Sequence, residues 1–390
     1  MTQPGTRFAP LAGQLRPAWA EVDLAAIRHN AAVLVAEVAP ARLCAVVKAA
    51  GYGHGAPEVA GAALDGGAEW LAVALVEEGR ELRAAGIDAP ILLLSEPASD
   101  AMAEVVDLSL TPTLYTPTGL DALVSAVGDG RQDRPFSVHV KVDTGMHRVG
   151  ASVDDAVALA LDVAASPALH LEGFWTHFAV SDEVDDPYTD HQVARYQQAL
   201  DVLAGAGVRP AIRHAANSGG AIWHPTSRFD MVRCGIALYG LSPAADGVTR
   251  HPVPRLRPAM SLKARVSYVK AVPAGERLSY GLRYRLERDS VIATVPLGYA
   301  DGVTRSLSAT GGEVLVGGRR RPISGTVTMD QILVDCGPGS NVAEGDEVVL
   351  LGRQGDEEIT AWEWAGRTST IGYEVVCGIS GRVPRSYLGA

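Results

Sequence analysis

A lysine ends an apolar segment and is followed at once by a glycine-rich turn, in the stretch Cys44-Ala-Val-Val-Lys48-Ala-Ala-Gly-Tyr52-Gly-His-Gly55. Only four of the 34 basic residues are lysine, so arginine supplies most of the positive charge. An amine at the mouth of an apolar strand is shielded from water, which lowers its pKa and favours nucleophilic chemistry. The stretch therefore predicts a nucleophilic or Schiff-base lysine at Lys48. The alternative is a strand-end lysine that extends its amine to solvent.

Length, charge and cysteine usage limit the class of protein. The 390 residues favour two domains, or one large barrel with a second unit. The net charge of −11 disfavours nucleic acid and anionic membranes as partners. The N-terminal segment does not read as a signal peptide, and no apolar run reads as a membrane span, so we expect a cytoplasmic protein. The four cysteines lie far apart without zinc-type spacing, which predicts buried thiols and no metal site.

Apolar strand candidates alternate with alanine-rich amphipathic segments through the first two thirds of the chain. Eight such strands with covering helices, in roughly 200–250 residues, predict a (β/α)8 TIM-type barrel. A doubly wound open sheet is the rival, but the first turn lacks its Gly-x-Gly-x-x-Gly spacing. The predicted strands are Leu43–Lys48, Trp70–Leu75, Ile91–Ser95, Leu110–Tyr115, Phe136–Asp143, Leu171–Phe178, Ala211–Asn217 and Met231–Leu238.

A proline-rich stretch at Pro243–Pro258 marks the expected domain boundary. Beyond it, short strand patterns with turns replace the alanine-rich helices, which predicts a mostly β C-terminal domain. We therefore expect a barrel domain over residues 1–247, with an irregular tail at 1–17, and a mainly β domain over residues 248–390. An additional strand is expected at Ala18–Leu24.

Several polar side chains directly follow the predicted barrel strands. Since the chemistry of such barrels lies at the C-terminal ends of the strands, these side chains are expected to converge on one rim. Taken singly, each has the alternative of being a solvated or loop-anchoring residue. The candidates are Lys48, Tyr52, Lys141, Asp143, Arg148, His177, Asn217, Ser218, Arg233, Gly235 and Ile236.

The last two strand ends carry the pattern of a phosphate site. Barrel phosphate sites are frequently formed by the loops after the seventh and eighth strands, where Ser218 and the Gly235–Ile236 backbone stand. A strand-end lysine, a phosphate cradle and an arginine together predict pyridoxal 5'-phosphate (PLP), which needs a Schiff-base lysine, phosphate anchors and a partner for its ring nitrogen. An aldolase-type barrel acting on sugar phosphates would also use lysine and phosphate groups, but it gives the second domain no role.

With these residues in place, the chain resembles the bacterial alanine racemases, which are barrel-type PLP enzymes. The signature is Val-Val-Lys48-Ala-x-x-Tyr52-Gly-His-Gly together with a distant Ser279-Tyr280-Gly281. The similarity extends from about residue 18 to about residue 386. Other matching stretches are Lys141–Gly150, Thr176–Phe178, Ala216–Ser218, Met231–Gly240, Gly298–Gly302, Met329–Gln331 and Gly372–Glu374.

The resemblance implies a role for each site residue. Lys48 would carry PLP and act as one catalytic base, and Tyr280 from a partner subunit would be the base on the opposite face. Arg148 would contact the phenolic oxygen and the substrate carboxylate, which the partner's Met329 would also help to bind, and Tyr299 would narrow the entrance. Lys141 corresponds to a lysine that is often carbamylated in this family. The expected cofactor ligands are Lys48, Tyr52, Arg148, His177, Asn217, Ser218, Arg233, Gly235, Ile236 and Tyr373.

The implied activity is interconversion of L-alanine and D-alanine by two bases in a homodimer that shares its sites, with D-alanine supplied for peptidoglycan. One alternative is a related PLP barrel, either a racemase that also takes serine or a decarboxylase. A decarboxylase would want a carboxylate at the ring nitrogen, where this chain has Arg233. The other alternative is a non-catalytic PLP carrier, against which the Ser279-Tyr280-Gly281 stretch argues.

Overall fold

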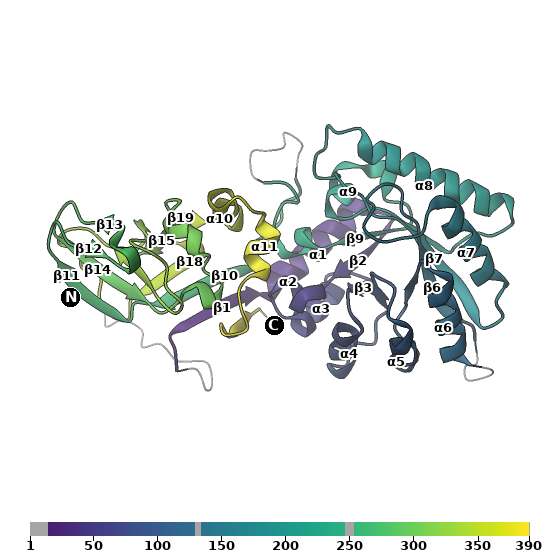
Figure 1. Ribbon diagram of the computed structural model, residues 1–390, viewed down its shortest axis with the longest axis horizontal. Helices are drawn as coiled ribbons and strands as arrows, with labels where there is room; N and C mark the ends of the chain where they lie inside the picture. The colour runs from purple at the N-terminus through teal and green to yellow at the C-terminus, as the bar shows by residue number, and fades with distance from the viewer. Residues whose placement is uncertain (1–14, 129–133, 246–252, 390) are drawn as a thin grey trace. The chain divides into compact units, whose positions relative to one another are not determined.

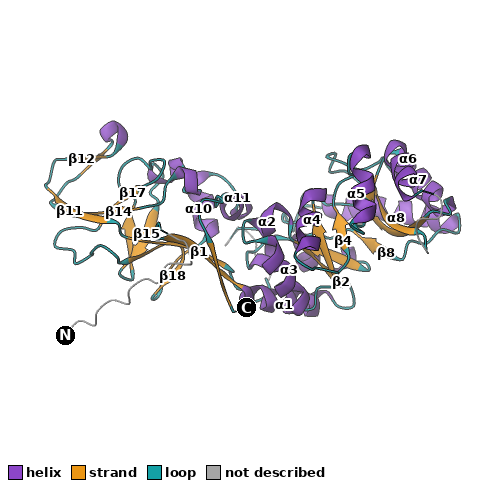
Figure 2. Cartoon of the chain, turned by 90° about the horizontal axis from the view of Figure 1, so that it is seen from below, coloured by secondary structure: helices purple, strands orange, loops and turns teal. Residues whose placement is uncertain are grey.

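The computed structural model describes residues 15–128, 134–245 and 253–389, and the chain divides into two compact units (Figure 1). One unit is Ala25–Arg257, and the other joins Pro258–Ala390 to the N-terminal segment up to Leu24. Figure 2 shows that helices dominate the first unit and strands the second. The boundary expected at residues 247 and 248 lies outside the described residues, as does most of the expected tail.

The first unit is an eight-stranded parallel barrel with the strand order 4-3-2-9-8-7-6-5. Two four-stranded sheets, β4-β3-β2-β9 and β5-β6-β7-β8, are joined between β4 and β5 by a bridge from Leu92 to Thr111. On the other side, hydrogen bonds from Asp230 N to Arg213 O and from Arg233 N to Ala216 O join β9 to β8. The strands are β2 (Arg42–Val46), β3 (Trp70–Val73), β4 (Ile91–Leu93), β5 (Thr113–Leu114), β6 (Phe136–Lys141), β7 (Leu169–Trp175), β8 (Ile212–His214) and β9 (Met231–Cys234).

Helices follow the strands and cover the barrel because their alanine-rich apolar faces need burial. Helix α7 (Val153–Ala165) is capped by the Ser152 side chain, which accepts from Asp155 N. The α-helices of this unit are α1 (Leu24–Val38), α2 (Lys48–Tyr52), α3 (Ala56–Asp65), α4 (Val76–Ala84), α5 (Met102–Asp107), α6 (Pro117–Val127), α7 (Val153–Ala165), α8 (Tyr188–Gly205) and α9 (Ser218–Trp223). Short 3-10 turns are η1 (Ser99–Ala101), η2 (Pro225–Ser227) and η3 (Ile236–Tyr239).

The predicted barrel and all eight of its strands are confirmed, but each predicted strand ends one to four residues too late, and the error is largest at the last strand. The apolar run that we predicted as one strand over Met231–Leu238 stops at Cys234. Gly235 then has φ −100° and ψ −93°, which no strand residue adopts, and the buried residues from Ile236 onward form η3. A buried 3-10 turn and a buried strand give the same apolar run in sequence.

The second unit is mostly β, as predicted, and it includes the strand expected near the N-terminus. β1 (Ala18–Asp23) pairs antiparallel with β10 (Met260–Arg265) and parallel with β20 (Arg385–Leu388). The strand therefore belongs to the second unit rather than to the barrel domain in which the sequence analysis included it. The main sheet has the order β16-β15-β18-β10-β1-β20, and a second sheet is β11-β14-β17.

The remaining elements of this unit are short. The other strands are β11 (Tyr268–Val272), β12 (Arg277–Leu278), β13 (Tyr284–Arg285), β14 (Ser290–Val295), β15 (Glu313–Val316), β16 (Arg319–Pro322), β17 (Ile332–Asp335), β18 (Glu347–Gln354) and β19 (Glu357–Ile359). The helices and turns are η4 (Tyr280–Leu282), η5 (Tyr299–Asp301), η6 (Arg305–Ser308), α10 (Ala361–Thr368) and α11 (Gly372–Cys377).

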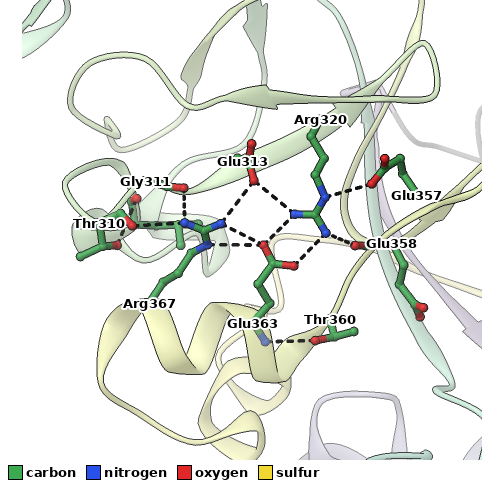
Figure 3. Close-up of polar contacts among 10 residues, drawn as sticks. Thr310, Gly311, Glu313, Arg320, Glu357, Glu358, Thr360, Glu363 and Arg367 are labelled. Carbon is green, nitrogen blue, oxygen red and sulfur yellow. Dashed lines mark hydrogen bonds and ion pairs between the residues drawn. The ribbon is translucent and has the colours of Figure 1, made fainter. Parts of the chain in front are cut away.

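An ion-pair network anchors α10 to the β15–β16 hairpin (Figure 3). Arg320 contacts Glu313 at 3.2 Å and Glu363 at 2.8 Å, and Arg367 contacts the same two carboxylates at 3.2 Å each. Arg320 also pairs with Glu357 of β19 at 3.0 Å. Because each guanidinium is shared between strand and helix carboxylates, the network fixes α10, which is followed directly by α11.

Two further expectations concern cysteines and membranes. Cys44, Cys234 and Cys336 are buried, as predicted, whereas Cys377 is exposed at the end of α11. Among the described residues, no helix combines the length and the hydropathy that a membrane crossing requires.

Candidate active site

Lys48 stands at the first position of α2, immediately after β2, and the turn that follows has the left-handed helical conformation. Ala49, Ala50 and Tyr52 have φ of 53°, 51° and 51°, and Gly51 lies between them at 61°. Left-handed helical backbone costs roughly 1–2 kcal/mol per residue with a Cβ. Such strain persists only when the surrounding structure holds it, and it clusters at functional sites.

An aromatic platform holds this turn. The Tyr239 ring lies between Tyr52 and His54, with ring centroids 4.8 Å and 4.6 Å away, and its hydroxyl donates to Val46 O at 3.0 Å. His54 is fully buried, and its Nδ1 lies 2.9 Å from Tyr52 O. Tyr239 belongs to η3, so the turn after the first barrel strand packs directly against the turn after the last one.

Two strand-end turns form a cradle of hydrogen-bond donors. Ser218 begins α9 and accepts from Gly235 N at 3.1 Å and Ala237 N at 3.4 Å. A Cβ on Gly235 would collide with the Tyr52 hydroxyl, so only glycine permits this approach. Asn217 caps α9 by accepting from Gly220 N at 3.0 Å and also accepts from the Ser181 hydroxyl at 2.6 Å. A phenol, a hydroxyl and two turn N-termini thus meet in one place, which is the donor set that a phosphate requires.

Arg233 lies on β9 and is almost completely buried. Its Nη2 donates to Thr176 O at 2.8 Å, to Ala215 O at 2.9 Å and to His177 Nδ1 at 3.1 Å. The guanidinium also lies over the Trp175 ring, 4.3 Å from its centroid. Burial lowers the pKa of Arg233 to about 10, which still leaves the guanidinium charged near neutral pH.

Positive charge is concentrated around His177. Burial lowers the pKa of His177 well below its usual value, and Arg233, Lys141, Arg148 and Lys48 lower it further, in that order. Four predicted site cations therefore act on one imidazole. Anions bound among these groups would relieve the repulsion between them, since like charges at short range repel each other.

Lys141 is a strongly perturbed amine of the site. It is 3% exposed, its ammonium lies 4.1 Å from the Trp175 ring centroid, and it donates to Leu94 O at 3.4 Å. Burial lowers the pKa of Lys141 to about 7, and Arg233 and Arg148 contribute in the same direction. About half of this amine is therefore uncharged near neutral pH.

The turn that carries Arg148 is shaped by Asp143. One oxygen of Asp143 accepts from the backbone N–H groups of Gly145, Met146 and His147 at 2.9–3.1 Å. Tyr188 donates its hydroxyl to Gly145 O at 3.0 Å, and a Cβ on Gly145 would collide with that hydroxyl. The exposed Arg148 therefore extends from a fixed loop.

In the second unit, three predicted residues are exposed on turns that are hydrogen-bonded to one another. Tyr280, Met329 and Tyr299 are 73%, 52% and 42% exposed. Thr326 donates to Tyr280 O at 2.8 Å. Tyr299 N donates to Thr328 O at 3.0 Å, and Ala300 N donates to Met329 O at 3.1 Å.

Two further features order this part of the second unit. Asp301 of η5 is fully buried, accepts from Gly298 N at 3.0 Å and pairs with Arg16 at 2.8 Å, which fixes the turn that carries Tyr299. Tyr373 lies on α11 and contacts Trp362 of α10 edge-to-face, with ring centroids 6.5 Å apart. Its position therefore depends on α10 and the network that anchors it.

Several residues that organise the site were not predicted from the sequence. Tyr239 and Trp175 support the predicted residues through their rings, and His139 and His214 lie behind Arg233. One signal was available for His139. It stands two residues before Lys141 on the same strand and therefore on the same, inward face. Tyr239 gave no signal, because an apolar run around an aromatic residue is typical of any core.

Comparison with known proteins identifies the family of the chain. The N-terminal domain of the alanine racemase family matches residues 22–243, and its C-terminal domain matches residues 259–387. An alanine racemase of Symbiobacterium thermophilum is 52% identical over 377 residues, which cover 96% of this chain and 98% of the relative. An alanine racemase of Thermobifida fusca is 44% identical, with 95% and 98% covered.

Solved structures agree with the sequence comparison. The crystal structure of alanine racemase from E. faecalis superposes with a TM-score of 0.90 at 39% identity, covering 96% of this chain and 99% of that one. Alanine racemase from Bacillus anthracis with bound L-Ala-P has a TM-score of 0.88 at 38% identity, with 96% of both chains covered. Since both family domains match in order along nearly the whole chain, the protein belongs to the alanine racemase family.

Proposed function

We propose that the protein interconverts L-alanine and D-alanine with PLP as its cofactor. The observation that carries the proposal is the arrangement of Lys48, the donor cradle and Arg233 at adjoining strand ends of one barrel. The family match supports the same reaction, since relatives that cover nearly the whole chain are named alanine racemases.

The residues of the barrel fit PLP. The cradle of Tyr52, Ser218, Gly235 and Ile236 would hold the phosphate. Gly235 and the Tyr52 hydroxyl approach each other closely, so the space for the phosphate beside them is small. Asn217 would act indirectly by capping α9. The cluster of cations around His177 fits the negative charges that the cofactor and a substrate carboxylate would bring. Tyr373 is proposed as a further ligand of the phosphate.

When bound, PLP makes the Cα proton of an attached amino acid acidic. Arg233 would face the ring nitrogen. A guanidinium is only a donor and keeps its protons near neutral pH, so Arg233 would leave that nitrogen unprotonated. His177 would lie beside the ring, and its low pKa keeps it neutral there.

Inversion of the Cα centre needs a base on each face of a planar carbon. The Lys48 amine would take or return the proton on one face, and the Tyr280 hydroxyl would do so on the other. Tyr280 is the most exposed of the predicted site tyrosines, so its own unit leaves it available to a second copy of the chain. We therefore propose a two-fold homodimer in which each site takes Lys48 from one copy and Tyr280 from the other.

Substrate binding would use Arg148 for the carboxylate, with Met329 from the partner copy, and Tyr299 would restrict the entrance. A small entrance favours alanine over large side chains. Serine adds only one hydroxyl, and apolar pockets reject such an addition weakly, so some serine turnover is expected.

Lys141 is proposed as a carbamylated lysine. Only an uncharged amine reacts with CO2, giving a carbamate and releasing one proton, and the pKa of about 7 supplies that form near neutral pH. The carbamate would be an anion close to Arg148 and Arg233. Protein equilibrated with ¹³C-bicarbonate should show a carbamate carbon signal that is absent from Lys141→Arg.

A subunit-mixing experiment tests the shared site. Lys48→Ala and Tyr280→Phe are each expected to be inactive with full-length protein and PLP. Mixed by unfolding and refolding, half of the dimers carry one of each chain, and each of these has one intact site and one doubly altered site. Activity should return to roughly a quarter of the wild-type value. No recovery in dimers shown to be mixed would place both residues in one chain and contradict the proposal.

The reaction would supply D-alanine for peptidoglycan in the cytoplasm. Complementation of a strain that depends on added D-alanine tests this role directly. Wild type should support growth, and Lys48→Ala should not.

A further inference from the structure

Behind Arg233, a chain of buried side chains crosses the interior of the barrel. Arg233 Nη1 lies 2.9 Å from His214 Nδ1, and His214 Nε2 lies 2.9 Å from His139 Nδ1. His139 Nε2 then lies 3.5 Å from a carboxylate oxygen of Glu172. Both histidines are fully buried.

The chemistry of the first member fixes the protons of all the others. A guanidinium has only donors, so His214 Nδ1 must accept and its proton must lie on Nε2. His214 Nε2 therefore donates to His139 Nδ1, which places the remaining proton of His139 on Nε2. That proton has the Glu172 carboxylate 3.5 Å from Nε2 as an acceptor, although His139 Nε2 forms no hydrogen bond among the described residues. The chain has one direction, from Arg233 to Glu172, and both histidines are neutral in it.

The local electrostatics agree with neutral histidines. Burial lowers the pKa of both His214 and His139, and the charge of Arg233 lowers that of His214 further. The stacking of His214 on Trp175, with ring planes 10° apart, holds its ring orientation.

The backbone is built to bring Glu172 into this chain. Val138 of β6 pairs with Leu171, but the next residue, His139, pairs with Gly173, so Glu172 is the extra residue of a β-bulge. Bulges re-aim a side chain, because they interrupt the alternation of the strand. The glycine beside the bulge is also required, since a Cβ on Gly173 would collide with the His139 ring.

Glu172 ends the chain at a cavity of about 600 Å³ near the beginnings of β6 and β7, which Arg134, Ser137 and His170 also line. Its side chain is 23% exposed, so water reaches the carboxylate. Burial alone would raise the pKa of Glu172, but interactions with His139 and His170 outweigh it and lower the pKa. By contrast, Arg233 forms no ion pair with any carboxylate among residues 15–128, 134–245 and 253–389.

We propose that Glu172 and His139 are positioning residues, which hold Arg233 in place through His214. Only one part of the inference rests on the proposed function, namely that Arg233 faces the ring of the cofactor in the active enzyme. The chain orients Arg233 but cannot pass a proton to the cofactor, because Arg233 does not give one up.

The tautomers provide a test that needs no cofactor and no activity. In full-length protein labelled with ¹⁵N-histidine, with and without PLP, His214 and His139 should each have the proton on Nε2 and none on Nδ1. Finding the proton of His214 on Nδ1, or finding either ring doubly protonated at neutral pH, would overturn the inference. This result stands whether or not alanine proves to be the substrate.

Variants at the middle of the chain provide the second test. His139→Leu removes the acceptor for His214, whereas His139→Asn keeps a polar atom near the position of Nδ1. Loss of such outer-shell partners typically costs ~10–100-fold, so we expect kcat to fall at least ~10-fold in His139→Leu, with KM little changed, and to recover largely in His139→Asn. His191→Leu, at an exposed histidine on α8 away from this chain, should match wild type.

Glu172→Gln covers the case in which His139→Leu does not fold. The amide keeps the size and an acceptor oxygen but removes the charge, so the Nε2–H tautomers should remain while kcat falls by a factor of about three or more. Equal kcat in Glu172→Gln and His191→Leu would contradict the role of Glu172. Equal kcat in a folded His139→Leu and His191→Leu would contradict the role of the whole chain.

Discussion

The two units hold their proposed site residues in opposite ways. In the barrel, Lys141, Arg233 and Ser218 are 2–4% exposed, and their neighbours perturb the charged groups among them. In the β unit, Tyr280 and Met329 extend from their turns with more than half of their surface exposed. The residues of the first group are already surrounded by other residues of the same chain. Those of the second group stay largely exposed until another surface covers them.

The difference separates two kinds of pre-organisation. The barrel fixes charge, because burial sets the pKa values of its cations before any ligand arrives. The β unit fixes only position, through a hydrogen-bonded set of turns around residues 279–282, 298–301 and 326–329. A phenol needs nearby positive charge to act as a base at neutral pH, and the cations of a second copy's barrel would supply that charge to Tyr280.

The largest effect is expected in the barrel half, from Lys48→Ala. Loss of the amine that is proposed both to carry the cofactor and to move the proton should lower kcat by at least ~10³-fold. The visible absorption of protein-attached PLP should disappear as well. A variant that kept both the absorption band and racemisation would show that Lys48 has neither role.

In the exposed half, Tyr280→Phe should lower racemisation by roughly 10²–10⁴-fold, since it removes one base and keeps the ring. Exchange of the Cα proton of one enantiomer with solvent deuterium should continue, because the other base remains. Tyr268→Phe is the matched control, at a tyrosine of the same unit that is 54% exposed. If the two variants racemised alanine equally well, Tyr280 would be no more important for the reaction than an ordinary surface tyrosine.

The buried charge of Lys141 should be visible as a pH dependence of stability. Its pKa is about 7 in the folded chain, below the ordinary value of 10.5, so the unfolded chain binds more protons between these values and stability rises with pH there. The slope from this group is at most about 1.4 kcal/mol per pH unit. In CO2-free buffer, the stability gained by wild type between pH 7.5 and 9 should be smaller in Lys141→Met. Parallel pH curves for the two proteins would mean that the amine is not desolvated.

The smallest effect is expected from the network around α10. Arg320→Met removes contacts to Glu313, Glu357 and Glu363, and we expect a loss of about 1–2 kcal/mol in the free energy of unfolding of the β unit, reduced by added salt. Arg353→Met provides the comparison, because Arg353 is 74% exposed and pairs with Glu358 alone. Single exposed ion pairs contribute about 0–1 kcal/mol. A similar loss of stability in both variants would show that the network around Arg320 is no stronger than a single exposed pair.

The same contrast explains what the sequence could predict. The barrel strands are continuous apolar runs with polar residues at their ends, so both the fold and the rim residues Lys48, Ser218 and Arg233 followed from pattern. The placement of β1 did not, because an N-terminal strand gives no sign of whether it pairs nearby or with β10 and β20, more than two hundred residues later. Short strands such as β12 and β13 are set by pairing rather than by propensity.

Within the site, pattern identified the residues with reactive groups and missed those that hold them. Glu172 reads as a solvated residue on a strand, and only the bulge in the β6–β7 pairing turns it toward His139. Tyr280 was named only through the family resemblance. A lone exposed tyrosine between serine and glycine carries no chemical signal in the sequence.

In the left-handed turn after Lys48, the conformational energy of the backbone depends on the chirality of each residue. At Ala49 and Ala50, with φ of 53° and 51°, an L-residue is strained, whereas a D-residue would be relaxed. A chain assembled chemically with D-alanine at these two positions would adopt the turn more readily than the natural one. The proposed enzyme thus holds two L-alanines beside its catalytic lysine in the backbone conformation that suits the mirror image of each.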